Sequence, residues 1–133
     1  RRRCTCGSWD CFEAYASGSG LKKTAEEILN NPTVTTYDVI KGVNNQDSLM
    51  ISIFNKWQDD ITNGLIGLSN LFDPDCIVLS GSMAEFVDTN KIETKVNQEI
   101  CTTPTKIYKA TTGNYSGMIG ATLLAFRKKE QHG

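Results

Sequence analysis

The sequence predicts an α/β fold with more helix than strand, and three features carry that prediction. From residue 50 to residue 72, apolar side chains recur at steps of three and four, the spacing of one buried helix face. Residues 76–80 form a short apolar run between turn residues, typical of a buried strand, and residues 106–110 alternate as a second strand. A helical pattern over residues 88–100 lies between them, so we expect a right-handed βαβ unit with parallel strands.

The composition is that of an ordinary soluble globular domain. The chain has 133 residues, a net charge of −1 and 39% hydrophobic residues, which fits one domain at most. This charge gives no reason to expect nucleic acid or an anionic membrane surface as a partner, and three arginines at positions 1–3 are weak evidence for either. No apolar run approaches the roughly 18–20 residues of a transmembrane helix.

Capping residues mark the predicted helices before the first strand. Residues 12–16 are expected to form one helical turn, and Ser19 is the predicted N-cap of the next helix, which residues 30–32 (Asn-Asn-Pro) end. Thr35-Thr36 is expected to cap a short third helix. Asp47 is the predicted cap of the long helix that follows.

A last helix is predicted towards the C-terminus, because Ile119, Leu123 and Phe126 recur on one helical face. Glycines inside helices lower stability by about 1 kcal/mol each relative to alanine. We therefore expect Gly64 and Gly67 of the long helix to lie where a neighbouring element approaches the backbone closely.

The cysteine-rich stretch near the N-terminus is the strongest chemical signal. Cys4, Cys6 and Cys11 lie within eight residues, and Gly7 lets the chain curl so that all three sulfurs face one ion. The alternatives are a disulfide with one free thiol, or three small apolar side chains. The chain has five cysteines, an odd number, and shows no secretory signal, which favours a metal site; no fourth ligand lies nearby.

The pattern Cys-x-Cys-Gly-x-x-x-Cys-x-Glu, continued by Ala14–Gly18, resembles the zinc signature of the ROK family of bacterial repressors and sugar kinases. The family pattern has glycine where this chain has Asp10. Pro74 before the first strand, Gly81 after it and a glycine-rich ending around Gly117 support the resemblance in the same order, so it covers nearly the whole chain.

The resemblance implies a fold and a domain organisation. ROK proteins have ribonuclease-H-like lobes of the actin and hexokinase type. Residues 1–133 would form a C-terminal portion of such an ATPase lobe, helix-rich with a short parallel βαβ unit. We expect a zinc loop over residues 4–13, a helical region over 14–72, and the βαβ unit with the final helix over 76–130.

The resemblance also assigns metal and sugar residues. Cys4, Cys6 and Cys11 would hold a structural zinc, with a histidine upstream of this chain as the fourth ligand. Glu13 would accept hydrogen bonds from sugar hydroxyls, a role that suits an ionised carboxylate. The alternative for Glu13 is a position in the first turn of a helix, where it would complement the helix dipole.

The same resemblance implies a nucleotide site. Ser80, Gly81 and Ser82 lie where a strand turns into a helix, a common place for ligands in α/β sheets, and Gly117 lies in the predicted last helix. These four residues would contact the adenosine of ATP. The alternative is that the turn binds nothing, because a strand, a turn with one glycine and a helix occur in many folds without a nucleotide.

The function implied is phosphoryl transfer from ATP, with Mg²⁺, to a hexose hydroxyl, as in glucokinase. The family's catalytic aspartate and phosphate loops lie upstream, so we assign no catalytic residue here and expect this chain alone to be inactive. Glucose is the default substrate; fructose, mannose, N-acetylglucosamine and N-acetylmannosamine stay open.

Two alternatives to a kinase remain. The first is the sugar-sensing half of a ROK transcriptional repressor, for which an upstream helix-turn-helix would decide and nucleic acid would be a partner. The second is a small zinc-stabilised interaction domain. The resemblance further implies a homodimer and a cytoplasmic location, without a membrane partner.

Overall fold

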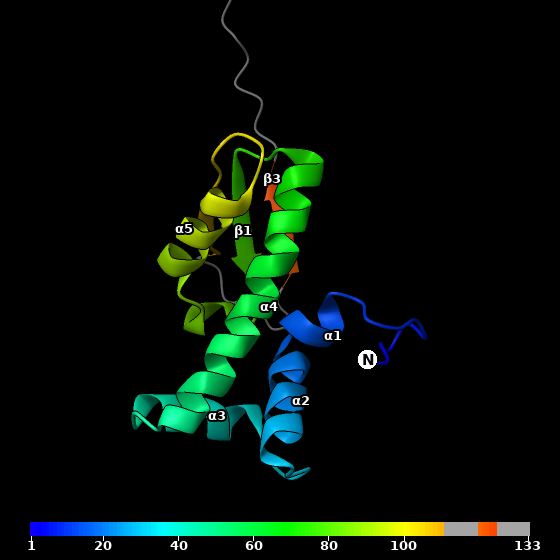
Figure 1. The fold of residues 1–133 in the computed structure, drawn as a ribbon, viewed down its shortest axis with the longest axis vertical. Coiled ribbons are helices and arrows are strands. Elements are labelled where there is room, and N and C mark those ends of the chain that lie inside the picture. The colour runs from blue at the N-terminus through cyan, green and yellow to red at the C-terminus, as the bar shows by residue number, and fades with distance from the viewer. Residues whose placement is uncertain (111–119, 125–133) are drawn as a thin grey trace, which may run out of the picture.

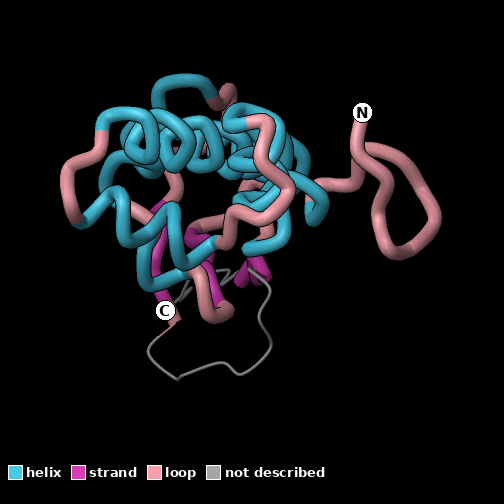
Figure 2. Tube along the Cα trace, turned by 90° about the horizontal axis from the view of Figure 1, so that it is seen from below, coloured by secondary structure: helices cyan, strands magenta, loops and turns pink. Residues whose placement is uncertain are grey.

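The structure, a computed structural model, describes residues 1–110 with their side chains and the backbone of residues 120–124 (Figure 1). The elements follow one another as α1 (Glu13–Ala16), α2 (Gly18–Leu29), α3 (Thr36–Asn44), α4 (Ser48–Phe72), β1 (Cys76–Ser80), the 3₁₀ turn η1 (Ala84–Phe86), α5 (Thr89–Glu99), β2 (Lys106–Lys109) and β3 (Gly120–Leu124). The helices form one layer and the strands lie beneath it, while the loop before α1 projects to one side (Figure 2).

The sheet confirms the predicted βαβ unit. Its strand order is β2-β1-β3, and β1 pairs with β2 in parallel, with Cys76 opposite Lys106. Helix α5 makes the connection between these two strands and packs against β2. Two parallel strands joined through a helix are what the sequence predicted.

Strand β3 overturns part of the predicted last helix. Residues Gly120–Leu124 run antiparallel to β1, with Ser80 opposite Gly120. Periodicity alone did not separate the two structures here, because a short apolar stretch fits a strand as well as a helix face. The second edge of β1 needs hydrogen-bond partners for its peptide groups, and β3 supplies them. The rest of the predicted helix lies outside the described residues.

Helix α4 is the central element of the fold. The Asp47 side chain caps it by accepting hydrogen bonds from the amides of Leu49 and Met50, as predicted, and Asp73 ends it in a left-handed conformation. The helix contacts α1, α2, α3 and α5. Most of its predicted stripe is buried, but Phe72 at the end of the helix is 58% exposed. The fully buried side chains include Trp57, Leu21, Ile53, Ile61, Leu65, Ile77, Leu79 and Ile92.

The predicted caps are right for α3 and wrong for α2. Thr35 and Asp38 form a reciprocal capping box at the start of α3. Helix α2 begins two residues earlier than expected, because the Ser17 hydroxyl, and not that of Ser19, accepts the Gly20 amide at 3.1 Å. Ser17 directly follows α1, so one residue ends the first helix and caps the second.

The two glycines of α4 differ. A Cβ on Gly64 would overlap the ring of Phe12, so the predicted close approach is confirmed there. The position that a Cβ would take on Gly67 has no described atom within 4 Å, so the same prediction is wrong for that residue. The ring of Phe12 therefore takes the place of a side chain at Gly64 and joins the start of α1 to α4.

Side chains of α5 occupy the outer edge of β2. The Glu93 carboxylate accepts the Ile107 amide at 2.8 Å. The Asn97 amide group both accepts the Thr105 N–H and donates to the Thr105 carbonyl, each at 2.9 Å. These three bonds satisfy peptide groups that β1 does not reach.

Among the described residues, no helix combines the length and the apolar character that a membrane crossing requires.

Candidate metal loop and sugar site

The cysteine loop is a small hairpin. Arg3 and Trp9 form an antiparallel bridge, and the Cys4 amide donates to the Ser8 carbonyl at 2.9 Å. At the tip, the Gly7 amide donates to the Cys4 carbonyl at 3.0 Å, and Gly7 has φ +92°, which glycine adopts readily. The hairpin thus turns residues on both of its arms towards one point.

The three predicted metal ligands meet at that point. The sulfurs of Cys4, Cys6 and Cys11 all lie within 4.8 Å of one another, and the Sγ atoms of Cys6 and Cys11 are 3.6 Å apart. Tetrahedral zinc with Zn–S bonds of about 2.3 Å separates its sulfurs by roughly 3.8 Å. The donor atoms and their spacing therefore fit zinc, and the described residues supply three ligands to this cluster.

Hydrogen bonds within the loop shift the pKa values of two of the cysteines in opposite directions. The Ser8 backbone amide, followed by the neighbouring thiols, lowers the pKa of Cys6 to about 7. The hydrogen bond with Cys6, followed by that with Cys4, raises the pKa of Cys11 to about 11. Metal ligands must be thiolates. The lowered pKa favours the thiolate form of Cys6, and binding of a metal would release a proton from Cys11.

Asp10, the one departure from the family pattern, has a backbone conformation that glycine adopts more readily. Its φ is +57°, a left-handed conformation that few non-glycine residues adopt. The carboxylate accepts the Arg2 amide at 2.8 Å, Arg1 Nε at 2.9 Å and the Tyr15 hydroxyl at 2.6 Å. These bonds hold the pKa of Asp10 well below its usual range and raise that of Tyr15. Aspartate in place of glycine therefore adds three hydrogen bonds to the loop, while its backbone conformation is less favourable than that of glycine.

Arg2 is a site residue that the sequence did not reveal. Its side chain is only 8% exposed and forms an ion pair with Glu27 at 2.8 Å. Three adjacent arginines carry no periodic signal that would single out the middle one. The partner lies 25 residues away in α2, and only folding brings the two together.

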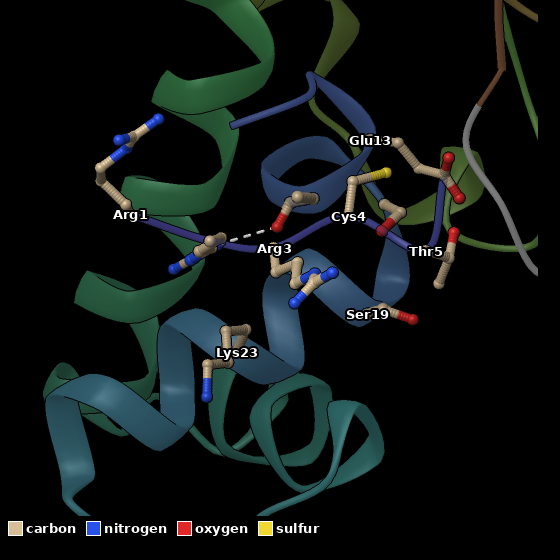
Figure 3. A pocket seen from close by; sticks show the side chains of 10 residues that line it. Arg1, Arg3, Cys4, Thr5, Glu13, Ser19 and Lys23 are labelled. Atoms are coloured by element: carbon tan, nitrogen blue, oxygen red, sulfur yellow. Dashed lines mark hydrogen bonds between the residues drawn. The ribbon is translucent and has the colours of Figure 1, made fainter. Parts of the chain in front are cut away.

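Glu13 opens α1 and lines a pocket of ≈ 440 Å³ beside the cysteine loop. Cys4, Thr5 and Glu13 gather at one side of this pocket, and Lys23 lies at the other (Figure 3). Among the described residues, no hydrogen bond or ion pair engages the Glu13 carboxylate. The described residues therefore leave its oxygens available to a ligand, although the first-turn position is also what a dipole-complementing role requires.

The predicted nucleotide turn has the expected shape. Strand β1 ends at Ser80, Gly81 has φ +107°, and the Ala84 amide donates to the Gly81 carbonyl at 3.1 Å as the chain enters η1. Gly117 lies outside the described residues. Contact between Ser80, Gly81 or Ser82 and a nucleotide stays a prediction.

The fold and the loop together define an α/β domain with a cluster of three cysteines that could hold a metal, beside a pocket that Glu13 lines. A sequence model described as the ROK family matches residues 1–128, and the chain belongs to that family.

Two curated relatives extend the comparison. An N-acetylgalactosamine kinase of Shewanella sp. (strain ANA-3) is 31% identical over 91% of this chain and 40% of its own length. An N-acetyl-D-glucosamine kinase of Pectobacterium atrosepticum is 30% identical over 93% of this chain and 41% of its own length. The chain thus spans less than half the length of these relatives.

A solved structure supports the fold. The ROK hexokinase from Thermus thermophilus superposes with a TM-score of 0.69 over 88% of this chain and 42% of that chain, at 23% sequence identity. The prediction of a hexokinase-type α/β lobe, helix-rich and with a short parallel pair of strands, is confirmed.

Proposed function

We propose that this chain is the C-terminal portion of an ATP-dependent sugar kinase that transfers a phosphoryl group to a hydroxyl of a hexose or hexose derivative. One observation carries the proposal. In a chain of the ROK family, Glu13 lines a pocket beside the cysteine loop, and its carboxylate has no partner among the described residues. Its two oxygens suit a grip on neighbouring sugar hydroxyls.

The proposal gives the predicted site residues three tasks: binding the metal, the sugar and the nucleotide. Cys4, Cys6 and Cys11 would hold zinc, which would hold the loop in one shape. Glu13 would accept hydrogen bonds from the sugar and orient it. Ser80, Gly81, Ser82 and Gly117 would contact the adenosine of ATP, whose phosphates are normally neutralised by Mg²⁺ in this reaction.

Four of the described aspartates already serve as helix caps or ion-pair partners, which supports the prediction that the catalytic base comes from elsewhere in the polypeptide. Asp47 and Asp88 cap helices. Asp59 pairs with Lys95, and Asp60 pairs with Lys56. A general base must reach a substrate proton, and carboxylates bound to their own helix or its neighbour are poor candidates.

We place N-acetylated hexosamines ahead of glucose as substrates. The relatives at 30% and 31% identity are N-acetylhexosamine kinases by name, which supports this order over the default expectation of glucose. The same names favour a kinase over a sugar-sensing repressor. A homodimer and a cytoplasmic location, where thiols stay reduced, belong to the proposal as well.

The test is a kinase assay on the complete polypeptide that contains this chain, with ATP and a panel of glucose, N-acetylglucosamine, N-acetylgalactosamine and N-acetylmannosamine. We expect Glu13→Gln to raise the sugar KM about tenfold or more, as loss of a charged hydrogen bond does, with the KM for ATP unchanged. Glu99→Gln, an exposed glutamate on α5, is the matched control and should change neither value. Sugar binding without ATP turnover would support the repressor, and no sugar binding at all would overturn the proposal.

A further inference from the structure

We infer that Arg2 is a positioning residue that fixes the cysteine loop and the Glu13 helix against α2, a task that the three cysteine ligands do not perform. The inference rests on the proposed function only where it concerns the sugar. The docking of the loop can be tested without any substrate.

The first argument is the set of contacts between Arg2 and α2. The guanidinium reaches both oxygens of Glu27, from Nε at 3.2 Å and from Nη2 at 2.8 Å. Nη2 also donates to the Thr24 hydroxyl at 2.9 Å. A two-pronged bond to a carboxylate fixes the orientation of the guanidinium as well as its position. Arg2 is therefore held rigidly on one face of α2.

The second argument is that Arg2 also holds α1. Nη1 donates to the Ala14 carbonyl at 3.2 Å and to the Gly20 carbonyl at 3.3 Å. The guanidinium lies over the Tyr15 ring, with its carbon 4.6 Å from the ring centre. Helix α1 has only four residues, too few to hold its own geometry by internal hydrogen bonds. Arg2 thus supplies contacts that orient the helix on which Glu13 stands.

The third argument concerns the reach of the metal. All three sulfurs come from residues 4–11, so the bonds that these three described ligands make to a metal would close the loop on itself. Arg2 lies at the base of that loop, where its amide donates to the Asp10 carboxylate and its carbonyl accepts the Asp10 amide, both at 2.8 Å. The side chain of Arg2 then continues to α2. The metal and Arg2 would therefore control two separable properties: the shape of the loop and its place on the protein.

Hydrogen exchange of zinc-loaded chain, with metal content measured in parallel, tests this separation. In Arg2→Lys we expect one zinc per chain to remain and the Cys4 and Gly7 amides, which bond within the loop, to keep their protection. The Ala14 and Ala16 amides of α1 should exchange at least tenfold faster. In wild-type chain stripped of metal, the Cys4 and Gly7 amides should exchange faster, while the Ala14 and Ala16 amides should keep their protection. Arg3→Lys, an exposed neighbour, is the control and should change neither set.

Two outcomes overturn the inference: unchanged exchange at Ala14 and Ala16 in Arg2→Lys, or loss of zinc together with faster exchange. The Ile92 amide of α5 reports global unfolding. If Arg2→Lys is globally unfolded, Glu27→Gln serves instead, because it removes the charge of the half-exposed partner of Arg2. This variant must show faster exchange at Ala14 and Ala16, by a smaller factor, with zinc and the protection of the loop amides kept. Faster exchange at Ile92 in Glu27→Gln as well would also overturn the inference.

A separate experiment tests whether Arg2 affects sugar binding through α1. In the complete kinase, Arg2→Lys should raise the sugar KM and leave the KM for ATP unchanged, because ATP does not contact α1 in the proposed site. Absence of sugar turnover in the wild-type protein would remove the proposed function but leave the exchange result standing.

Discussion

The cysteine loop with α1 and the core around α4 are held together by different interactions. In the loop region, most contacts are hydrogen bonds and ion pairs of Arg2 and Asp10, and the Phe12 ring adds an apolar contact with α4. Trp9 is half exposed, with the guanidinium groups of Arg1 and Arg3 near its ring. The core is held by apolar side chains of α2, α4, α5 and the sheet that are almost fully buried. Polar contacts respond to pH, salt and metal, while apolar burial responds mainly to temperature and denaturant. The region that carries the candidate site is thus the region whose geometry solution conditions can change.

The core should give the largest effect on stability. Trp57 is fully buried, and its indole N–H donates to the Ser17 carbonyl at 3.1 Å, so it links α4 to the junction of α1 and α2. We expect Trp57→Ala to lower the free energy of unfolding by about 3–5 kcal/mol, measured by urea denaturation. Phe72→Ala, on the same helix but exposed, should lower it by less than about 1 kcal/mol. Equal losses from the two substitutions would contradict the packing described for α4.

Breaking the metal cluster should affect the loop and spare the core. Wild-type chain purified without chelator should hold about one zinc, and Cys11→Ser should lower zinc affinity by about a hundredfold or more. Chelator competition measures the affinity, and urea denaturation should show a nearly unchanged core. Cys101→Ser, outside the cluster, is the control. Full zinc retention in Cys11→Ser would mean that the cluster is not the metal site.

Glu93 should make the sheet sensitive to acid. The Ile107 amide holds the pKa of Glu93 below its ordinary value, so its stabilisation is complete above the unfolded pKa of about 4.3 and is lost as pH falls through the lower folded pKa. We expect Glu93→Gln to lower the free energy of unfolding by about 1 kcal/mol at pH 7.

Urea denaturation of both proteins from pH 7 to pH 3 measures this loss. The difference between wild type and Glu93→Gln should shrink towards low pH. Glu99→Gln, exposed on the same helix, should show no such trend. A difference that stays constant with pH would rule out the Glu93 carboxylate as the acid-sensitive group.

The smallest effect is expected at Asp10, where two substitutions separate backbone from side chain. Asp10→Ala loses the three side-chain hydrogen bonds and keeps the unfavourable positive φ, whereas Asp10→Gly loses the same bonds and relieves the backbone. The zinc-loaded loop should therefore release metal to a chelator faster in Asp10→Ala than in Asp10→Gly. The reverse order would show that backbone strain at this position is unimportant.

Local signals predicted much of the fold. Asp47, Thr35 and Asp88 sit at helix starts because their side chains accept nearby amides, and such bonds span only two or three residues. The prediction failed where the deciding partner is distant in sequence. Residues 120–124 became a strand because β1 offers them an edge, and Ser17 replaced Ser19 as a cap because α1 ends directly before it.

The same division holds for the site. The cysteine cluster was predictable because its three ligands lie within one short loop. Arg2 was not, because its carboxylate partner Glu27 lies far along the chain. Asp10 was recognised only as a departure from a pattern, and its three hydrogen bonds became visible only in the folded loop.

The hydrogen bonds from α5 to β2 have a consequence for association between chains. An unoccupied strand edge is a template on which another strand can add, and it is a common start of aggregation. Where β2 begins, Glu93 already binds the outward-facing Ile107 amide and Asn97 binds both peptide groups of Thr105, so the helix covers this part of the strand edge. An incoming strand would have to displace these side chains first, so we expect them to oppose strand addition at the start of β2.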